Sequence, residues 1–416
     1  MIFEFESNGD SSTLRAHFEL GDKYTGKRQE GALRQITYSG TDITFDYGVR
    51  SIHPDLLGLL CLIIFYPFVG QRVVFPMPVS RRLEKAFRKP SFTRPFRFDN
   101  VDHRLDRYSG SKMALSFGGG IDSTAVRVMF PEAFVVHEAH TRNGHLVPSF
   151  SHDVVRSLGP ERGALVTTNQ RYVSRPGGWH GWTCAFATSL LLATDFDFGI
   201  VLMGSTISST LLYGGTRYWN RFGARRKHGV TGNYWQSVFN EVGLPVFSPV
   251  CGVSGYMTMN LSLDLIRQGK VFFCTTRNGA ACLRCTKCLR RDLMRAVVDP
   301  THRPDWAPYD RQDVHEYLER QPLHCGHLFA YAQTRVPDLP PFLASRLRAL
   351  PVIDSDWPMR VHVRTFDLCD SGWREEIRDR VVAHVEPMER RHLREVRNWD
   401  IRPVDQRPSR WRRIRP

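Results

Sequence analysis

Short apolar runs separated by segments of helical spacing dominate the middle of the chain. Four runs have the length and composition of buried strands: KMALSF (112–117), AFVVHE (133–138), FGIVLMG (198–204) and LPVFSPV (244–250). Three further segments place apolar residues at helical intervals: 125–130, 180–196 and 257–269. Strands that alternate with helices in this way predict an α/β fold with a doubly wound parallel sheet.

The first hundred residues have a different pattern, which predicts a separate α+β domain over 1–105 whose role the sequence does not indicate. Residues 36–49 and 71–80 are extended runs, and Ser80 stands where it can cap a helix over 81–87. The longest apolar run, Leu56 to Phe68, is thirteen residues long, whereas a membrane-spanning helix needs about 20. We therefore expect a buried helix or a pair of strands there, and no membrane partner.

The last part of the chain, 299–416, is rich in proline, histidine and arginine. Segments 311–321 and 373–396 predict helices, so the region is expected to be partly helical. The last fifteen residues carry six arginines against one aspartate, which predicts an exposed basic tail. Residues 106–298 then form the central domain between two outer regions.

Composition and charge narrow the class of protein. A hydrophobic content of 42% excludes a disordered chain, and the net charge of +15 favours a polyanionic partner without choosing among nucleotide, nucleic acid and membrane surface. Of the 57 basic residues 49 are arginines, a skew that a GC-rich genome would also produce. The N-terminus has no basic stretch before an apolar core, and four of the nine cysteines crowd together, so we expect a reducing, cytoplasmic location with one metal site.

A glycine-rich loop follows the first central strand. Three glycines let the backbone turn sharply and expose consecutive N–H groups beside a helix N-terminus, which predicts a phosphate cradle. Hydroxyl groups of Ser123 and Thr124 can donate to the same oxygens, while Asp122 suits a helix N-cap or a ligand of Mg²⁺. The alternative is a plain glycine turn. The loop comprises Gly118, Gly119, Gly120, Ile121, Asp122, Ser123 and Thr124.

Four cysteines with the spacing C-x7-C-x2-C-x2-C follow the central domain's last predicted helix. Cys-x2-Cys steps let a tight turn wrap one tetrahedral Zn²⁺, and four thiolates leave no open position, so a structural role is expected. An iron–sulfur cluster and unligated core cysteines are the alternatives. The four are Cys274, Cys282, Cys285 and Cys288, with the basic neighbours Arg284, Lys287, Arg290 and Arg291 to offset thiolate charge.

The segment LSFGGGIDST resembles the Ser-Gly-Gly-x-Asp-Ser loop of the PP-loop ATP pyrophosphatase superfamily, whose fold is adenine nucleotide α-hydrolase-like. Gly118 stands in place of the family's serine, and Ser116 lies two positions earlier. The resemblance implies ATP and Mg²⁺ as cofactors, with Asp122 and Ser123 in catalysis. It implies a nucleotide site made of Ser116, Gly118, Gly119, Gly120, Asp122, Ser123, Thr124 and Gly204, with adenine near Val135, Val136 and His137. Arg217 of a basic loop is a further candidate for this site.

Loop and cysteine cluster together resemble the 7-cyano-7-deazaguanine synthase (QueC) family over about residues 110 to 298. Gly204 matches that family's substrate segment, whereas its Asn, its Asp-Cys and a lysine are absent. The resemblance implies an AMP-forming ligase that adenylates a 7-carboxy-7-deazaguanine-type carboxylate for amide or nitrile formation or for conjugation to an amine. Longer QueC-like chains occur in antiviral defence operons, which implies a protein or nucleic-acid acceptor and a homodimer or operon-encoded complex.

Several residues carry competing interpretations. Basic residues at 217–227, beginning with Arg217, could close over a triphosphate or form a solvated loop. His137, His140, His145 and His152 fit no single helical face and are expected to be structural, and Cys184 is expected to be a buried helix residue. The functional alternative is a nucleic-acid-binding or tRNA-modifying PP-loop protein, or a catalytically degenerate scaffold.

Overall fold

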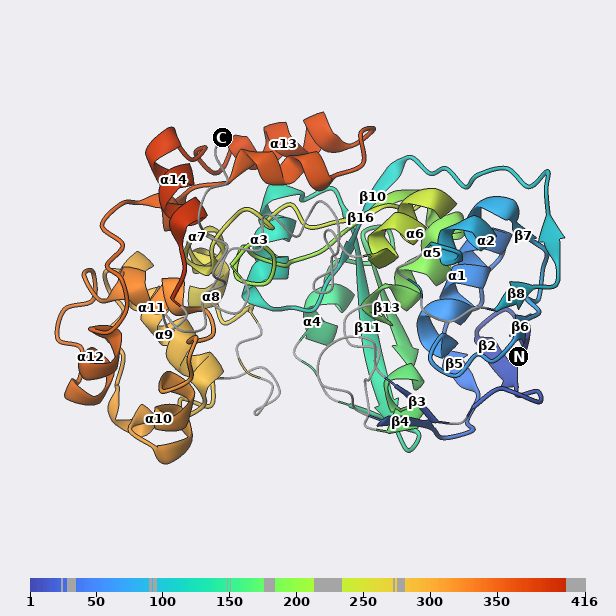
Figure 1. The fold of residues 1–416 in the computed structure, drawn as a ribbon, viewed down its shortest axis with the longest axis horizontal. Helices are drawn as coiled ribbons and strands as arrows, with labels where there is room; N and C mark the ends of the chain where they lie inside the picture. Colours follow the sequence, from blue (N-terminus) through green and yellow to red (C-terminus); the bar gives the residue numbers. More distant parts are fainter. Residues whose placement is uncertain are drawn as a thin grey trace, which may run out of the picture.

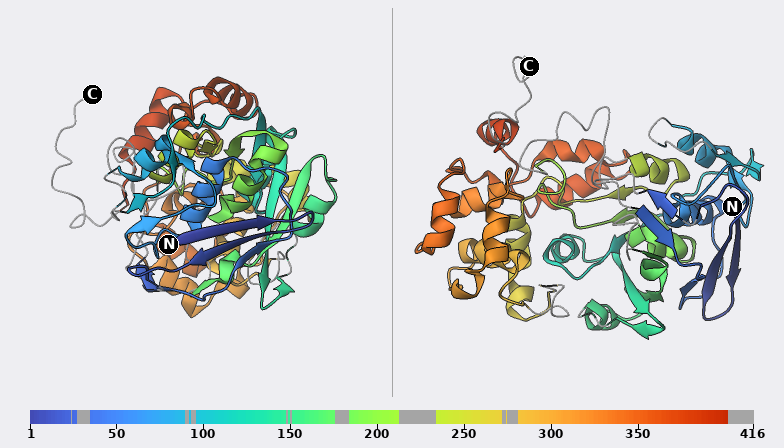
Figure 2. Two further views of the ribbon diagram at one scale, coloured as in Figure 1. Left: turned by 90° about the vertical axis from the view of Figure 1, so that its right-hand side faces the viewer. Right: turned by 60° about the horizontal axis from the view of Figure 1, so that its bottom comes forward.

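The computed structural model describes residues 1–401 apart from 24, 28–34, 90–91, 93–95, 148, 150, 176–183, 213–233, 272–273 and 275–280. A large twisted sheet with helices on both sides occupies one part of the molecule, and a helical region the other (Figure 1). The right-hand view in Figure 2 also places the N-terminal strands (blue) and the helices α10–α12 (orange) at opposite ends of the molecule. Residues 213–233 and 402–416, which include the predicted basic loop and tail, lie outside the described residues.

Five parallel strands form the centre of the sheet. They are β10 (Lys112–Ser116), β11 (Phe134–Arg142), β13 (Gly163–Thr168), β15 (Phe198–Leu202) and β16 (Val246–Phe247), in the spatial order β13-β11-β10-β15-β16. The strand order therefore reverses between β10 and β15. Open α/β sheets bind ligands outside the carboxyl ends of their strands at such a reversal. The predicted mixed α/β fold with a mostly parallel sheet is confirmed.

The N-terminal segment extends the same sheet. Antiparallel strands β5 (Ile43–Phe45), β2 (Ser12–His17) and β1 (Ile2–Ser7) add successively beyond β13, so the sheet continues across residue 105, where we expected a domain boundary. The three-domain division itself remains a prediction. Short strands complete the β-structure: β3 (Thr25–Lys27), β4 (Gln35–Tyr38), β6 (Arg72–Val73), β7 (Val79–Ser80), β8 (Arg97–Phe98), β9 (Val101–Asp102), β12 (His145–Leu146) and β14 (Ser174–Arg175).

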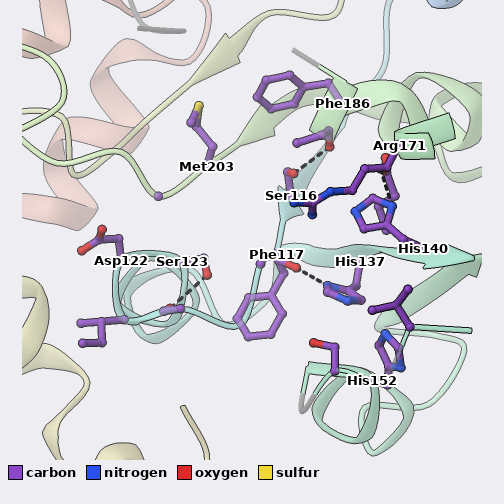
Figure 3. Close-up of a pocket in the computed structure, with 18 of the residues that line it drawn as sticks. Ser116, Phe117, Asp122, Ser123, His137, His140, His152, Arg171, Phe186 and Met203 are labelled. Carbon is purple, nitrogen blue, oxygen red and sulfur yellow. Dashed lines mark hydrogen bonds and ion pairs between the residues drawn. The ribbon is translucent and has the colours of Figure 1, made fainter. Parts of the chain in front are cut away.

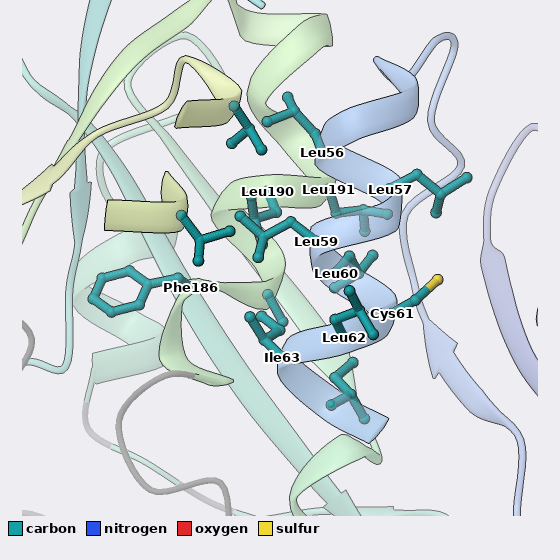
Figure 4. Packing of buried hydrophobic residues seen from close by; sticks show 14 of the residues in the cluster. Leu56, Leu57, Leu59, Leu60, Cys61, Leu62, Ile63, Phe186, Leu190 and Leu191 are labelled. Carbon is teal, nitrogen blue, oxygen red and sulfur yellow. The ribbon is translucent and has the colours of Figure 1, made fainter. Parts of the chain in front are cut away.

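One face of the sheet is covered by two apolar helices. The longest apolar run forms a single buried helix, α1 (Pro54–Phe65), which packs against α5 (Ala187–Phe196); Figure 4 shows their leucines interlocking. Burial of one leucine side chain contributes roughly 1.5–3 kcal/mol, so this layer is a main source of stability. The alternative of paired strands is wrong, because residues 56–65 of this run are helical and only its last three residues form a turn.

The other face packs against α3 (Ile121–Met129) and α13 (Arg374–Val382). Alternating residues of β10 show the two-sided burial: Ala114 joins the core with α1 and α5, whereas Met113 and Leu115 join the core with α3. A third core lies among the C-terminal helices and includes three of the clustered cysteines. The remaining helices C-terminal to residue 254 are α7 (Gly255–Leu261), α8 (Leu263–Arg267), α9 (Thr286–Val298), α10 (Gln312–Leu318), α11 (Gly326–Ala332), α12 (Pro341–Leu347) and α14 (Arg390–Asn398).

Local predictions hold where a short-range cause acts. Ser80 caps α2 (Arg81–Phe87) through a hydrogen bond to the amide of Leu83, as expected. The helix expected over 257–269 is instead two helices, α7 and α8, because buried Ser262 interrupts it and donates to the carbonyl of Ile121. The elements that the patterns did not predict include β13, α4 (Ser151–Arg156) and α6 (Tyr234–Val242).

Short 3-10 turns link these elements: η1 (Gln170–Tyr172), η2 (Cys184–Phe186), η6 (Ala307–Tyr309), η7 (Trp357–Met359) and η8 (Val363–Leu368). Among the residues that the structure describes, none of the helices has both the length and the apolar composition needed to cross a bilayer.

Candidate functional site

The glycine loop lies at the point where the strand order reverses. β10 ends at Ser116 and α3 begins at Ile121, with Gly120 as its N-cap. Gly119 has φ +68°, a left-handed conformation that side chains disfavour, whereas a Cβ at Gly118 would meet no atom within 4 Å. The first-turn N–H groups of α3 thus follow directly on the loop, and they have no intrahelical acceptors.

Asp122 is the second residue of α3 and not its N-cap, which corrects one of the two roles that we considered for it. Thr258 of α7 donates to Asp122 Oδ1 over 2.7 Å. Burial raises the pKa of Asp122, while the positive charges of Arg291 and Lys287 act in the opposite direction. The carboxyl group therefore stands in a low-dielectric environment with cations close by.

The hydroxyl groups of the first turn have different surroundings. Ser123 Oγ donates to the carbonyl of Gly120 over 3.1 Å and borders the cavity described below. Thr124 is 1% exposed, and its hydroxyl has no hydrogen-bond partner among the described residues. Thr124 does not line the cavity. Of the two hydroxyl groups we predicted for phosphate, Ser123 is the one at the cavity wall.

Gly204 allows the segment after β15 to lie against α3. A Cβ at this position would sit 2.4 Å from the amide nitrogen of Ser123 and 2.6 Å from the carbonyl carbon of Asp122. Real side chains do not tolerate such distances to backbone, so the residue must be glycine for this approach. The structure thus gives Gly204 a packing role, and it also borders the cavity.

A cavity of about 690 Å³ opens at the carboxyl ends of β10, β11 and β15 (Figure 3). This volume is typical of sites for small-molecule ligands. Figure 3 shows Asp122 and Ser123 on one side and His140 and Arg171 on another. Residues at the ends of β10, β11 and β15 and residues of α9 contribute to its walls. The lining residues are Ser116, Phe117, Gly118, Gly120, Ile121, Asp122, Ser123, His137, Glu138, His140, Val147, Ser149, His152, Arg171, Tyr172, Ala185, Phe186, Met203, Gly204, Lys287 and Arg291.

The strand β11 supplies one wall because it runs past the end of β10. Ser116 pairs with Val136, so Glu138 and His140 lie beyond the last residue of β10. Burial raises the pKa of Glu138 to about 8, and burial lowers the pKa of His140 to about 4. Glu138 Oε1 lies 3.3 Å from His140 Nδ1. Both groups are therefore neutral over much of the physiological range.

His137 lies on the same strand and holds a fixed tautomer. Its Nδ1 lies 2.6 Å from the carbonyl oxygen of Phe117, which requires the proton on Nδ1, and burial lowers its pKa to about 4. The ring of His152 lies 5.4 Å away, while His145 is exposed on β12. The cavity is thus bordered by His137, His140 and His152 but not by His145.

Other predicted nucleotide residues are placed differently. Ser116 borders the cavity, but its hydroxyl donates to the carbonyl of Ala185 over 3.0 Å. Val136 is buried in the core and does not border the cavity, because its side chain points into the layer that contains α1 and α5. Arg217 lies outside the described residues, and Cys184 begins the turn η2.

The four clustered cysteines form a compact tetrad. The Sγ atoms of Cys274 and Cys285 are 3.8 Å apart, those of Cys282 and Cys288 are 3.7 Å apart, and all four lie within 4.8 Å of one another. A tetrahedral ion with Zn–S bonds of about 2.3 Å holds its sulfur atoms about 3.8 Å apart. The cluster could therefore hold one metal ion such as zinc.

The tetrad also sets the start of α9. Cys285 is the N-cap of that helix, and its Sγ accepts from the amide of Cys288 over 3.4 Å. Two and six residues after this N-cap, Lys287 and Arg291 border the cavity. Burial lowers the pKa of both groups. The cysteine tetrad thus positions two basic groups that we had expected only to offset thiolate charge.

Comparison with known proteins adds one finding. Residues 234–400 match the profile of a family of unknown function, DUF6395. The matched segment includes α7, the cysteine tetrad, α9 and the C-terminal helices, but not the glycine loop. No curated protein and no solved structure matches the chain.

Proposed function

We propose that the chain is an AMP-forming enzyme of the PP-loop type, which activates a carboxylate with ATP. The observation that carries the proposal is the glycine loop at the reversal of strand order, opening into a 690 Å³ cavity that Lys287 and Arg291 also border. A helix N-terminus, a glycine turn and two cations together match the charge of a triphosphate. The sequence resemblance to PP-loop enzymes supports the same conclusion.

The proposed reaction has two steps. An oxygen of the substrate carboxylate attacks the α-phosphorus of ATP, the bond from that phosphorus to the bridging oxygen breaks, and pyrophosphate leaves with its electron pair. An amine then attacks the acyl carbon, AMP leaves, and the amine nitrogen loses a proton. Loop N–H groups, Lys287 and Arg291 neutralise charge that develops on phosphate oxygens, and Asp122 would hold Mg²⁺, which screens the same charge.

The cysteine tetrad has a structural role in this proposal. With zinc bound, it would fix the first turn of α9 and so hold Lys287 and Arg291 beside the loop. The resemblance to QueC-like proteins supports a 7-carboxy-7-deazaguanine-type carboxylate as the substrate and an amine or a protein partner as the acceptor. It also supports a role in antiviral defence.

The test is to incubate the protein with ATP and 7-carboxy-7-deazaguanine and to quantify AMP and pyrophosphate by mass spectrometry. We expect equal amounts of both, and a rate reduced roughly 100-fold or more in Asp122→Ala. Asp264→Ala is the matched control, because Asp264 is an exposed carboxylate on α8 outside the cavity. If ATP is converted at the same rate without 7-carboxy-7-deazaguanine, this compound is rejected as the substrate. If the protein does not bind ATP, the enzyme class is rejected.

A catalytically degenerate, nucleic-acid-binding protein is the second candidate. The observation in its favour is that Gly118 lacks the family's hydroxyl and that Ser116, the nearest substitute, donates to the carbonyl of Ala185. This candidate predicts RNA or DNA affinity that falls steeply with salt, and no pyrophosphate release.

A further inference from the structure

The helix α14 carries an arginine face on the surface of the molecule. We propose that this face, made of Arg390, Arg394 and Arg397, binds the phosphate backbone of a nucleic acid. It lies outside the site of the proposed reaction, because α14 contributes no residue to the cavity at the glycine loop. A partner surface is thereby assigned to a part of the chain that the proposed reaction does not use.

Helical geometry places the three arginines on one face of α14. Arg394 follows Arg390 by four residues and precedes Arg397 by three, and residues at these intervals are neighbours on a helix surface. All three are exposed, whereas His392 and Val396 on the opposite side of the helix are buried. The arginine face extends about 10 Å along the helix axis, a length over which one strand of B-form DNA carries about three phosphates.

The arginine face has no counter-charge among the residues that the structure describes. The two glutamates of this segment have other partners: Glu389 caps α14 and pairs with Arg391 over 3.1 Å, and Glu395 accepts a hydrogen bond from Ser355 over 2.7 Å. Like charges three and four residues apart destabilise a helix, and a cation in its first turn opposes the helix dipole. The helix therefore keeps charges that its own stability does not favour.

The preceding helix, α13, has the opposite arrangement of charge. Its first turn contains Glu375 and Glu376, which suit the helix dipole. Arg378 forms an ion pair with Glu375, and Arg380 forms one with Glu376. Both helices lie at the surface of the molecule (Figure 1), so exposure alone does not leave arginines unpaired. The unpaired positive charge is a property of α14.

The exposed face of α14 consists of charged and polar residues, which indicates the kind of partner. Its apolar side chains, Leu393 and Val396, pack against the core of the C-terminal helices. A helix that binds a membrane inserts an apolar face, and a protein interface has an apolar centre. Nucleic acid needs neither, because guanidinium groups bind its phosphates through paired hydrogen bonds. The sequence that follows, 402–416, adds six arginines against one aspartate.

The test measures binding of the full chain to single-stranded RNA, single-stranded DNA and duplex DNA of about 20 nucleotides, at several salt concentrations from about 50 to 300 mM. A triple variant carries Arg390→Gln, Arg394→Gln and Arg397→Gln. Loss of three phosphate contacts should weaken binding roughly 10-fold or more at the lowest salt and reduce the slope of log K against log salt by roughly 2–3. Lysine at the same three positions keeps the charge and should retain the slope.

A charge-matched control removes three exposed cations elsewhere, with Arg50→Gln, Arg104→Gln and Lys112→Gln. Equal losses in the two triple variants would show that general charge attracts nucleic acid, and the role of α14 would be rejected. It is also rejected if the unchanged protein binds none of the three nucleic acids at the lowest salt, or binds only vesicles that contain phosphatidylserine. Thermal unfolding verifies that each variant is folded. If the triple variant of α14 is not, its three single variants replace it, each with a slope reduced by roughly 0.7–0.9.

Discussion

The glycine loop borders the cavity, and the cysteine tetrad lies at the start of α9, whose Lys287 and Arg291 border the same cavity, but loop and tetrad obtain their geometry in different ways. The loop is shaped by the backbone: Gly119 supplies a left-handed turn, and Gly204 lets another segment approach the first turn of α3. The tetrad brings together four thiols whose mutual repulsion on ionisation only a metal ion would offset. The difference teaches that the shape of the loop follows from sterics alone, whereas the placement of the basic residues that face it depends on how the tetrad is held together.

The largest effect should come from breaking the tetrad. Structural zinc sites in small domains contribute roughly 10–16 kcal/mol to folding, so Cys285→Ser should lose its metal and cause the greatest drop in thermal stability. Because Cys285 also caps α9, nucleotide affinity should fall as well. Elemental analysis and thermal unfolding with and without a chelator measure both effects.

A buried cysteine outside the tetrad serves as the control. Cys369→Ala removes a buried thiol without touching the tetrad, and it should keep one metal ion per chain. An unchanged metal content in Cys285→Ser would contradict the proposed ligand set, and a visible iron–sulfur absorption band would replace zinc as the bound species.

The next largest effect is expected at Gly204, where the segment after β15 lies against the first turn of α3. Gly204→Ala places a methyl group against the backbone of Ser123, and the required shift should cost roughly 3 kcal/mol of unfolding free energy. Gly9→Ala is the control, because a Cβ there meets no atom within 4 Å. Chemical denaturation compares the two variants, and equal stability would show that the segment after β15 does not rest on α3.

A smaller effect separates two adjacent glycines of the loop. Gly119→Ala forces a side chain into a left-handed conformation and should cost about 1–2 kcal/mol. Gly118→Ala should leave the free energy of unfolding nearly unchanged, because its Cβ would meet open space. Denaturant midpoints measured side by side decide the matter, and equal losses at the two positions would contradict this loop conformation.

The smallest expected effect concerns Thr258, whose hydroxyl group donates a hydrogen bond to the carboxylate of Asp122. Burial already raises the folded-state pKa of Asp122, so the folded chain retains a proton that the unfolded chain releases, and stability falls as pH rises above about 4. Thr258→Val removes a hydrogen bond that lowers this pKa and should extend the fall to higher pH. We expect a loss of about 1 kcal/mol that is greater at pH 7 than at pH 4.

Denaturation at several pH values measures this effect, with the exposed Thr44→Val as control. A loss that does not depend on pH would show that Thr258 acts through packing and not through Asp122.

Sequence patterns predicted the elements whose causes are local. The strand, glycine turn and helix at 112–130 and the capped helix α2 each follow from apolar spacing, caps or glycine content, whereas for the buried run that forms α1 the pattern left a helix and a pair of strands open. The spacing of the four cysteines likewise indicated a site that could hold one metal ion, and the tetrad confirms it. In contrast, GALVTT of β13 follows a clear turn at Gly159-Pro160 but is not strongly apolar, so its place at the centre of the sheet was not foreseen.

The sequence by itself therefore determined the loop, the tetrad and the class of fold, because these depend on residues close together in the chain. The tertiary structure alone decided that strands β1, β2 and β5 extend the central sheet, that Glu138 borders the cavity and that Lys287 and Arg291 face the glycine loop. Strand register and helix packing decide which way a side chain points, and both arise from contacts between segments far apart in sequence. A polar residue in a strand cannot reveal its neighbours until that pairing is known.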